Sequence, residues 1–278
     1  MTALPQIPLA GVIGCPAAQS RSPHLFRHWL DQQDRAGHYV PLHVEPEDLE
    51  RVLRSMGQMG FVGANVTLPH KQRALEIADD VSDRARHIGA ANTLTFGKDG
   101  RIHADNTDGY GFLANLQQGA PNWDPQQGPA LILGAGGAAR AIIVSLLDAG
   151  VPQILLANRT RARAEELAQT FGPALHVIDW EEAPAAIADT TTLINTTSLG
   201  MTGKDPLTLD LSALTPAHLV TDIVYAPLQT DLLKAADQAG ATTVDGLGML
   251  LHQAVPGCER WFGFRPQVTD DTRRAVLA

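Results

Sequence analysis

The stretch ALILGAGGAAR at residues 130–140 joins a short apolar run to closely spaced glycines and then to a helix-forming segment. A buried strand, a G-x-G-x-x-(G/A) turn and a helix in this order are typical of a dinucleotide-binding turn. Gly134 permits the tight turn, Gly136 lets backbone approach a pyrophosphate, and Ala139 is the small residue where helix meets strand. The free N–H groups at the helix start favour a phosphate. An ordinary glycine turn of a parallel sheet is the alternative.

Six short apolar runs, most of them separated by helical patterns, predict a Rossmann-type sheet around this turn. They are Ala130–Leu133, Ile154–Ala157, Leu175–Ile178, Leu193–Asn195, Leu219–Ile223 and Thr242–Val244. The tail from Leu247 predicts two further helices.

The chain before the turn also alternates short apolar runs with helical patterns, which predicts α/β layers with a largely parallel sheet. The expected strands are Leu9–Ile13, His38–Val44, Gly63–Val66, Thr93–Phe96 and Arg101–Asn106, and helices are expected to start near Pro23, Glu47 and Lys71. The segment 119–129 is rich in Pro, Gly and Gln, and it is the best candidate for a boundary or a surface crossing.

The residues after the glycine turn's neighbouring strand, ILLANRTRAR at 154–163, indicate which cofactor binds. Sites for NAD usually have Asp or Glu at the end of this strand, where the carboxylate accepts hydrogen bonds from the ribose 2′-OH. Here that position is Asn158, so no carboxylate repels a 2′-phosphate. Arg159 and Arg163 can bind this phosphate, and Thr160 can add a hydroxyl. The pattern favours NADP(H); a solvated helix start is the alternative.

Composition narrows the classes of function. The 278 residues carry a formal net charge of −9, which disfavours nucleic acid as a partner. The two cysteines, Cys15 and Cys258, are far apart and form no C-x-x-C, so their spacing suggests neither a zinc site nor a disulfide framework. The N-terminal residues do not resemble a signal peptide, and no apolar run approaches membrane-spanning length. We therefore expect a cytoplasmic protein with no membrane partner.

Polar residues in the first half of the chain gather in four segments. These are QSRSP (19–23), NVTLPHK (65–71), GAANT (89–93) and DNTDGYG (105–111). Lys71 follows a predicted strand at a loop-to-helix junction, and Thr107 or Asp108 can cap the next helix. If Lys71 and Asp108 meet, the carboxylate would hold the ammonium in place for proton transfer. A solvated lysine and a capping aspartate are the alternatives.

These segments, in register along nearly the whole chain, resemble the shikimate dehydrogenase family, whose members use NADP in aromatic amino acid biosynthesis. The matching motifs are GCPAAQSRSP, GANVTLPHK, GAANTL, DNTDGYG, GAGGAAR, NRT, NTTSLGM, DIVYAPLQT and DGLGMLLHQA. The resemblance implies two α/β domains. The first is an N-terminal α/β substrate domain, residues 1–107, completed by C-terminal helices at 247–278. The second is a Rossmann-type NADP-binding domain, residues 108–246.

The resemblance also implies the reaction and the residues that carry it. The reaction would be reversible NADPH-dependent reduction of 3-dehydroshikimate to shikimate, with Lys71 and Asp108 as the catalytic pair. The implied substrate-binding residues are Ser20 and Ser22 at the carboxylate, Thr67, Asn92 and Gln253 at the hydroxyls, Asp108, and Tyr225 near the carboxylate. The implied NADP contacts are Gly134, Gly136, Gly137, Ala138, Asn158, Arg159, Thr160, Arg163 and Gly246. A monomer or homodimer that binds only small molecules is expected.

Two positions depart from the family pattern. Gln19 stands where members usually have His, and Cys15 where they usually have Asn. Neither change removes an implied binding group. The nearest alternative is a quinate/shikimate dehydrogenase with broader substrate or cofactor use. A non-catalytic NADP(H)-sensing protein is a further alternative, but it would have no need of the lysine, the aspartate or the two serines.

Overall fold

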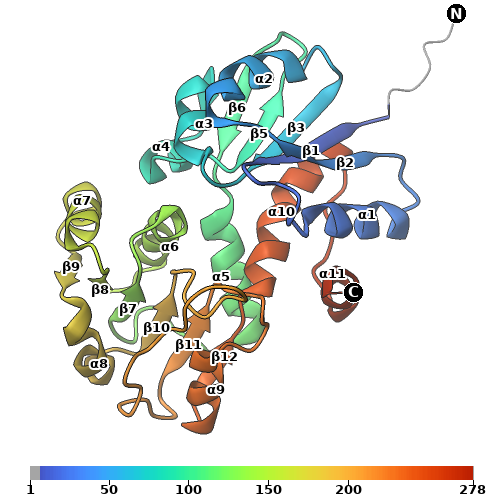
Figure 1. The fold of residues 1–278 in the computed structure, drawn as a ribbon. Coiled ribbons are helices and arrows are strands. Elements are labelled where there is room, and N and C mark those ends of the chain that lie inside the picture. The colour runs from blue at the N-terminus through green and yellow to red at the C-terminus, as the bar shows by residue number, and fades with distance from the viewer. Residues whose placement is uncertain (1–6, 278) are drawn as a thin grey trace, which may run out of the picture. The chain divides into compact units, whose positions relative to one another are not determined.

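The computed structural model describes residues 7–277, which form two units of α/β structure (Figure 1). The first unit comprises Met1–Thr107 and Leu251–Ala278, and the second comprises Asp108–Leu250. The α/β class predicted from the sequence is confirmed. The chain therefore leaves the first unit after Thr107 and returns to it at Leu251, inside the helix Leu247–Phe262.

The first unit contains six strands and seven helices or helical turns in its described residues. They are β1 (Leu9–Gly14), α1 (Ser22–Gln32), β2 (His38–His43), the 3-10 turn η1 (Pro46–Asp48), α2 (Leu49–Met56), β3 (Phe61–Val66), α3 (Lys71–Ile77), β4 (Asp80–Val81), α4 (Asp83–Ile88), β5 (Thr93–Phe96), β6 (Ile102–Asp105), most of α10 (Leu247–Phe262), and α11 (Asp270–Leu277). The five strands predicted here are present, with small shifts at their ends.

The sheet of the first unit has the order β2-β1-β3-β5-β6-β4. Strand β1 pairs in parallel with β2 and β3, whereas β5 runs antiparallel to both β3 and β6. The prediction of a largely parallel sheet is thus only partly right for this unit. The connection from Phe96 to Ile102 is too short for a crossover helix, so β6 must return antiparallel to β5.

The sheet of the first unit buries apolar side chains on both faces. Helices α2 and α3 contribute to one cluster with the strands, through residues that include Leu53, Met56 and Ile77. A separate aromatic group joins α1, β2 and α10: the ring of Phe26 stacks on Tyr39 at 3.9 Å between centroids, and Trp261 lies 5.8 Å from Phe26. Helix α10, from the far end of the chain, is therefore part of this core.

The second unit consists of a six-stranded sheet with helices on both faces. Its elements are α5 (Asp108–Gly119), β7 (Ala130–Leu133), α6 (Gly137–Asp148), β8 (Ile154–Ala157), α7 (Arg161–Phe171), β9 (Leu175–Ile178), η2 (Trp180–Glu182), α8 (Ala183–Ala186), η3 (Ile187–Asp189), β10 (Thr192–Asn195), β11 (Leu219–Asp222), α9 (Asp231–Gln238) and β12 (Thr242–Val244). The predicted strands are confirmed to within one residue at each end.

The strand order β12-β11-β10-β7-β8-β9, with all pairs parallel, is that of a Rossmann sheet. Side chains alternate along β7: Ile132 packs with α5 and α6, and Leu131 and Leu133 pack with α8 and α9. The segment 119–129 lies inside this unit as the loop between α5 and β7, so it is a surface crossing and not a boundary. Within residues 7–277, no helix has the length and apolar character needed to span a membrane.

Candidate functional site

Two of the polar segments of the first unit lie on the loops that follow the parallel strands β1 and β3. Cys15 follows β1, and its N–H donates to the carbonyl of Leu68 at 3.1 Å. Thr67 follows β3, and its N–H donates to the carbonyl of Ile13 at 2.9 Å. A Cβ on Gly14 would lie 2.6 Å from the Thr67 methyl carbon, so glycine is needed for this close approach. The loops after β1 and β3 are thereby fixed side by side.

The two predicted carboxylate-binding serines lie on the loop that leads from β1 into α1. Ser22 is the first residue of α1 and is buried, and its N–H donates to the Ser20 hydroxyl at 3.3 Å. The Ser22 side chain also hydrogen-bonds Tyr39. Burial raises the pKa of Tyr39 well above its ordinary value, although the Ser22 hydrogen bond opposes this. The phenol therefore stays neutral and donates to Asn65 Oδ1 at 2.7 Å.

Asn92 and Gln253, predicted to bind hydroxyls, are brought together by β5 and α10. Asn92 Nδ2 donates to Gln253 Oε1 at 3.2 Å. Asn92 Oδ1 accepts from the backbone N–H of Thr107 at 2.8 Å and from the Thr93 hydroxyl at 2.9 Å. The Thr107 hydroxyl donates to the backbone carbonyl of Gln253 at 2.8 Å. This buried network fixes both amides before any ligand arrives, which is the condition for precise positioning.

The predicted catalytic residues lie at the starts of two helices. Lys71 is the first residue of α3, its side chain is partly exposed, and its carbonyl accepts the N–H of Ala91, next to Asn92, at 2.8 Å. Asp108 is the first residue of α5 and is only 6% exposed. Lys71 belongs to the first unit and Asp108 opens the second. Their pairing therefore stays a prediction.

The glycines of the predicted dinucleotide turn fall into two kinds. Gly134 has φ +104°, and a Cβ there would lie 2.8 Å from side-chain atoms of Thr196 and Thr197. The fold itself therefore requires glycine at this position. At Gly136 and Gly137, in contrast, an added Cβ would have no neighbour within 4 Å. The space over the start of α6 is open, as a pyrophosphate would need.

The loop after β8 and the first turn of α7 present two exposed arginines, Arg159 and Arg163. Asn158 links this loop to the glycine turn: its Oδ1 accepts from Ala135 N–H at 3.1 Å, and its Nδ2 donates to the Thr160 carbonyl at 2.8 Å. Arg161 is held by Glu165 and Asp179. Among residues 7–277, the side chains of Arg159 and Arg163 make no such ion pair and are exposed. These two guanidiniums remain available to an anion, and this part of the chain fits a 2′-phosphate.

A buried network at the ends of β10 and β11 was not predicted as part of the site. Asp222, fully buried, accepts from Asn195 Nδ2 at 2.9 Å and from the Thr230 hydroxyl at 2.8 Å. Burial raises its pKa, against the hydrogen bonds it accepts. The network orders the turn that carries Tyr225. The available signal was an aspartate at a strand end, inside the quoted motif DIVYAPLQT, with its partner Asn195 at the start of the motif NTTSLGM.

Gly246 and Tyr225, the remaining predicted residues, lie close to this turn in the second unit. A Cβ on Gly246 would lie 2.3 Å from the carbonyl oxygen of Ile223, so a side chain there would collide with backbone. Tyr225 is partly exposed and follows β11 by three residues. Ala138 lies in the first turn of α6. The fold thus explains Gly246 without reference to any ligand.

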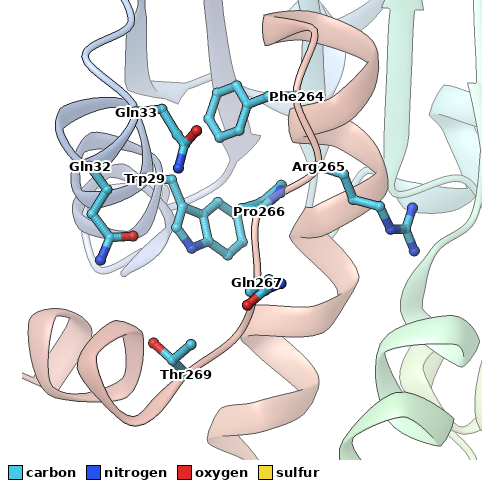
Figure 2. Close-up of a pocket in the computed structure, with 8 residues that line it drawn as sticks. All are labelled: Trp29, Gln32, Gln33, Phe264, Arg265, Pro266, Gln267 and Thr269. Carbon is cyan, nitrogen blue, oxygen red and sulfur yellow. The ribbon is translucent and has the colours of Figure 1, made fainter.

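A cavity of about 450 Å³ lies elsewhere in the first unit, between α1 and the segment after α10 (Figure 2). It is lined by Trp29, Gln32, Gln33, Phe264, Arg265, Pro266, Gln267 and Thr269. None of the predicted site residues is among them. The indole N–H of Trp29 is buried and has no hydrogen-bond partner among the described residues.

Comparison with known proteins identifies the family that this chain resembles. Three family models match: shikimate dehydrogenase substrate binding domain over residues 12–94, shikimate / quinate 5-dehydrogenase over 117–202, and shikimate 5'-dehydrogenase C-terminal domain over 246–277. The shikimate dehydrogenase (NADP(+)) of Ruegeria sp. (strain TM1040) is 62% identical over 272 residues, which are 98% of this chain and 99% of the relative.

Solved structures with the same fold include enzymes of both expected specificities. Quinate dehydrogenase from Corynebacterium glutamicum in complex with NAD has a TM-score of 0.90 at 32% identity, covering 97% of this chain and 98% of the other. Shikimate 5-dehydrogenase from Thermus thermophilus in complex with NADP(H) and shikimate has a TM-score of 0.86 at 34% identity, with the same coverage. Sequence motifs, strand order and full-length identity agree, and the chain belongs to the shikimate dehydrogenase family.

Proposed function

We propose that this protein is an NADP-dependent shikimate dehydrogenase that reversibly reduces 3-dehydroshikimate to shikimate. The observation that carries the proposal is identity of about 60% along the whole chain to curated shikimate dehydrogenases (NADP(+)). The prearranged amides and hydroxyls of the first unit support it, because such groups suit a polyhydroxylated acid. We assign substrate binding to residues 1–107 with 247–278, and NADP binding to residues 108–246.

The substrate side of the proposal rests on the first unit. Ser20 and Ser22 bind the carboxylate at the start of α1, and Thr67, Asn92 and Gln253 bind hydroxyls. Tyr225 adds a contact near the carboxylate from the second unit. The hydrogen bonds between Asn92 and Gln253 support this assignment, because they hold both amides in one orientation.

The cofactor side of the proposal rests on open space and unpaired charge. Gly134, Gly136, Gly137 and Ala138 would hold the pyrophosphate, and Asn158, Arg159, Thr160 and Arg163 would hold the adenosine ribose and its 2′-phosphate. Gly246 completes the set at the start of α10. When bound, NADPH supplies the hydride for the reduction. The open positions at Gly136 and Gly137 support this placement.

Lys71 carries the proton in the proposed mechanism. Its ammonium donates a proton to the substrate oxygen during reduction and recovers it in the reverse direction. The Asp108 carboxylate holds the ammonium and accepts a hydrogen bond from a substrate hydroxyl. The protein works on small molecules as a cytoplasmic monomer or homodimer, without a nucleic-acid or membrane partner.

Lys71→Met tests this mechanism because it keeps the length of the side chain and removes the proton. We expect kcat to fall by about 10²–10⁴-fold with a modest change in KM. Lys98→Met, in the exposed turn between β5 and β6, is the matched control and should retain full turnover. Titration with NADP shows whether each variant is folded. Near-normal turnover of a folded Lys71→Met protein would contradict the role of Lys71.

A quinate/shikimate dehydrogenase is the second candidate, favoured by the structural similarity to a quinate dehydrogenase with NAD. Initial rates with shikimate or quinate, each with NADP or NAD, separate the two functions. A preference for shikimate and NADP is expected, since no carboxylate stands at Asn158. Comparable rates in all four combinations would favour the broader enzyme.

A further inference from the structure

A cluster of three metal-binding side chains lies at the ends of β1 and β2, outside the set of residues assigned above. Cys15 Sγ lies 3.4 Å from Glu45 Oε2 and 3.9 Å from His43 Nε2. His43 Nε2 lies 2.9 Å from Glu45 Oε1. One ligand atom from each residue falls within 4.8 Å of the other two. A thiol, an imidazole and a carboxylate thus point at one small volume.

The backbone holds these residues in place before any ion binds. Gly14 pairs with His43 in the parallel register of β1 and β2, so Cys15 emerges beside the end of β2. The Val44 N–H donates to the Gly14 carbonyl at 3.2 Å, and the buried Val44 side chain anchors the loop that carries Glu45. Such preorganisation lowers the entropic cost of collecting three ligands.

The distances suit a tetrahedral ion. With Zn–S of about 2.3 Å and Zn–N or Zn–O of about 2.0–2.1 Å, ligand atoms of a tetrahedral site lie roughly 3.3–3.5 Å apart. The 3.4 Å separation from Cys15 to Glu45 Oε2 lies within this range. The 3.9 Å separation from Cys15 to His43 lies about 0.4 Å above it, and the 2.9 Å separation from His43 to the other oxygen of Glu45 lies about 0.4 Å below it. Small side-chain rotations therefore bring all three atoms to an ion.

The chemistry and accessibility of the cluster favour a borderline divalent cation over Mg²⁺ or Ca²⁺. Sulfur and imidazole nitrogen bind Zn²⁺ and its neighbours, whereas Mg²⁺ and Ca²⁺ prefer oxygen ligands. Cys15 is partly exposed and His43 and Glu45 are exposed, so an ion can enter from solvent.

We infer that Cys15, His43 and Glu45 form a site for one Zn²⁺-like cation, with water at the fourth position. Zinc sites with three protein ligands and one open position are well known. The site depends on Cys15, the position at which this chain departs from its family's usual asparagine. It stands independently of the proposed function, because its test measures the metal and not turnover.

Cobalt binding tests the site directly. Reduced, chelator-treated full-length protein is titrated with Co²⁺, and a thiolate-to-cobalt absorption band with tetrahedral intensity should appear at one ion per chain. Added Zn²⁺ should remove the band. Cys15→Ser should abolish it, whereas Cys258→Ala, which changes the other, fully buried cysteine, should leave it intact. A wild-type protein without this band, or a Cys15→Ser protein that keeps it, would overturn the inference.

Two further variants keep the test decisive if Cys15→Ser folds poorly. His43→Gln and Glu45→Gln should each weaken Zn²⁺ binding by more than about tenfold, since even loss of a group behind a ligand costs about 10–100-fold. His103→Gln is the matched control, because His103 forms an exposed pair with Asp80 and lies outside the cluster. Equal affinity in all three variants would show that the metal binds elsewhere and would reject the site.

Discussion

Gly137 and Gly134 belong to one turn but are glycines for different reasons. Gly137→Ala should leave stability unchanged or raise it by up to about 1 kcal/mol, because the position is helical and open. It should weaken NADP binding, because the methyl group occupies space assigned to the pyrophosphate. Gly134→Ala should lower the free energy of unfolding by at least about 1–2 kcal/mol, since its φ is left-handed.

Thermal unfolding and NADP titration of the two variants measure stability and affinity separately. Wild-type protein is the reference in both assays. Unchanged NADP affinity in the Gly137→Ala protein would contradict the proposal that the pyrophosphate binds at this position.

The free arginines after β8 determine cofactor preference in our proposal. The double variant Arg159→Ala, Arg163→Ala should lose about 100-fold or more in NADP affinity, because each of the two charge-assisted contacts contributes roughly 1.5–3 kcal/mol. Affinity for NAD should hardly change, since NAD lacks the 2′-phosphate. Arg161→Ala is the control: its guanidinium is already paired with Glu165 and Asp179. The measurement is the ratio of the dissociation constants for NADP and NAD. The same ratio in the double variant as in wild-type would count against the assignment.

At this scale the sequence predicts the place of a residue in the fold well where a motif is continuous. The glycine turn and the segment 158–163 each run from one strand end into the helix that follows it, so spacing alone places them in the fold. Cys15 and His43 are far apart in sequence and meet only through the register of two parallel strands. Cysteine spacing therefore indicated no metal site, although the fold assembles a candidate.

At the scale of elements, strand β3 and helix α10 meet at one point without spare room. A Cβ on Gly63 would lie 1.9 Å from Trp261 Nε1, whose N–H donates to the Leu94 carbonyl at 3.1 Å. The indole is thus held on the sheet and cannot move without losing its hydrogen bond.

Gly63→Ala should therefore lower the free energy of unfolding by about 1–3 kcal/mol or more, as overpacking does. Gly57→Ala, at the end of α2, is the control. The nearest atom to its added Cβ is 3.6 Å away, so its effect should be small. Urea unfolding of both variants gives the comparison. Equal stability would mean that Trp261 repacks freely.

The elements of the second unit were easier to predict than those of the first. Strands buried on both faces, such as β7, are continuous apolar runs, which sequence inspection recognises. Strand β4 has only two residues, Asp80 and Val81, both partly exposed, so it carries no such signal. The direction of β5 follows from its strand partners and from the short turn after it. The pattern of apolar residues in the sequence does not encode this direction.

At the scale of the whole molecule, the first unit is built from two stretches of chain, and Asp105 helps to join them. Its carboxylate accepts hydrogen bonds from Arg84 at 2.6 Å and from Arg260 of α10. Burial alone raises the pKa of Asp105. The hydrogen bonds from Ser82 and the two arginines outweigh burial, and the pKa lies below its ordinary value.

The pKa of Asp105 is lower in the folded protein than in the unfolded protein, so the ionised carboxylate stabilises the fold at every pH above its unfolded-state pKa. This contribution is lost as the pH falls through the folded-state pKa. Asp105→Asn should cost about 1.5–3 kcal/mol at neutral pH. The difference from wild-type should shrink below about pH 4. Asp80→Asn, in an exposed pair with Arg101, should cost less than about 1 kcal/mol. Denaturant unfolding from pH 3 to pH 7 measures both, and a pH-independent difference would exclude this charge as the cause.

The return of residues 251–278 to the first unit has a consequence for biosynthesis. The sheet of the first unit leaves the ribosome before the second unit is synthesised, but Arg260 and Trp261 emerge only after the second unit. At about 5–20 residues per second, α10 is synthesised roughly 7–30 s after the last strand of this sheet. The second unit, whose chain is continuous, is complete before that helix. The nascent chain can thus complete the second unit before the first. Until α10 is synthesised, the surface of the first sheet that will contact Trp261 is exposed, and it is this surface that a chaperone would have to cover.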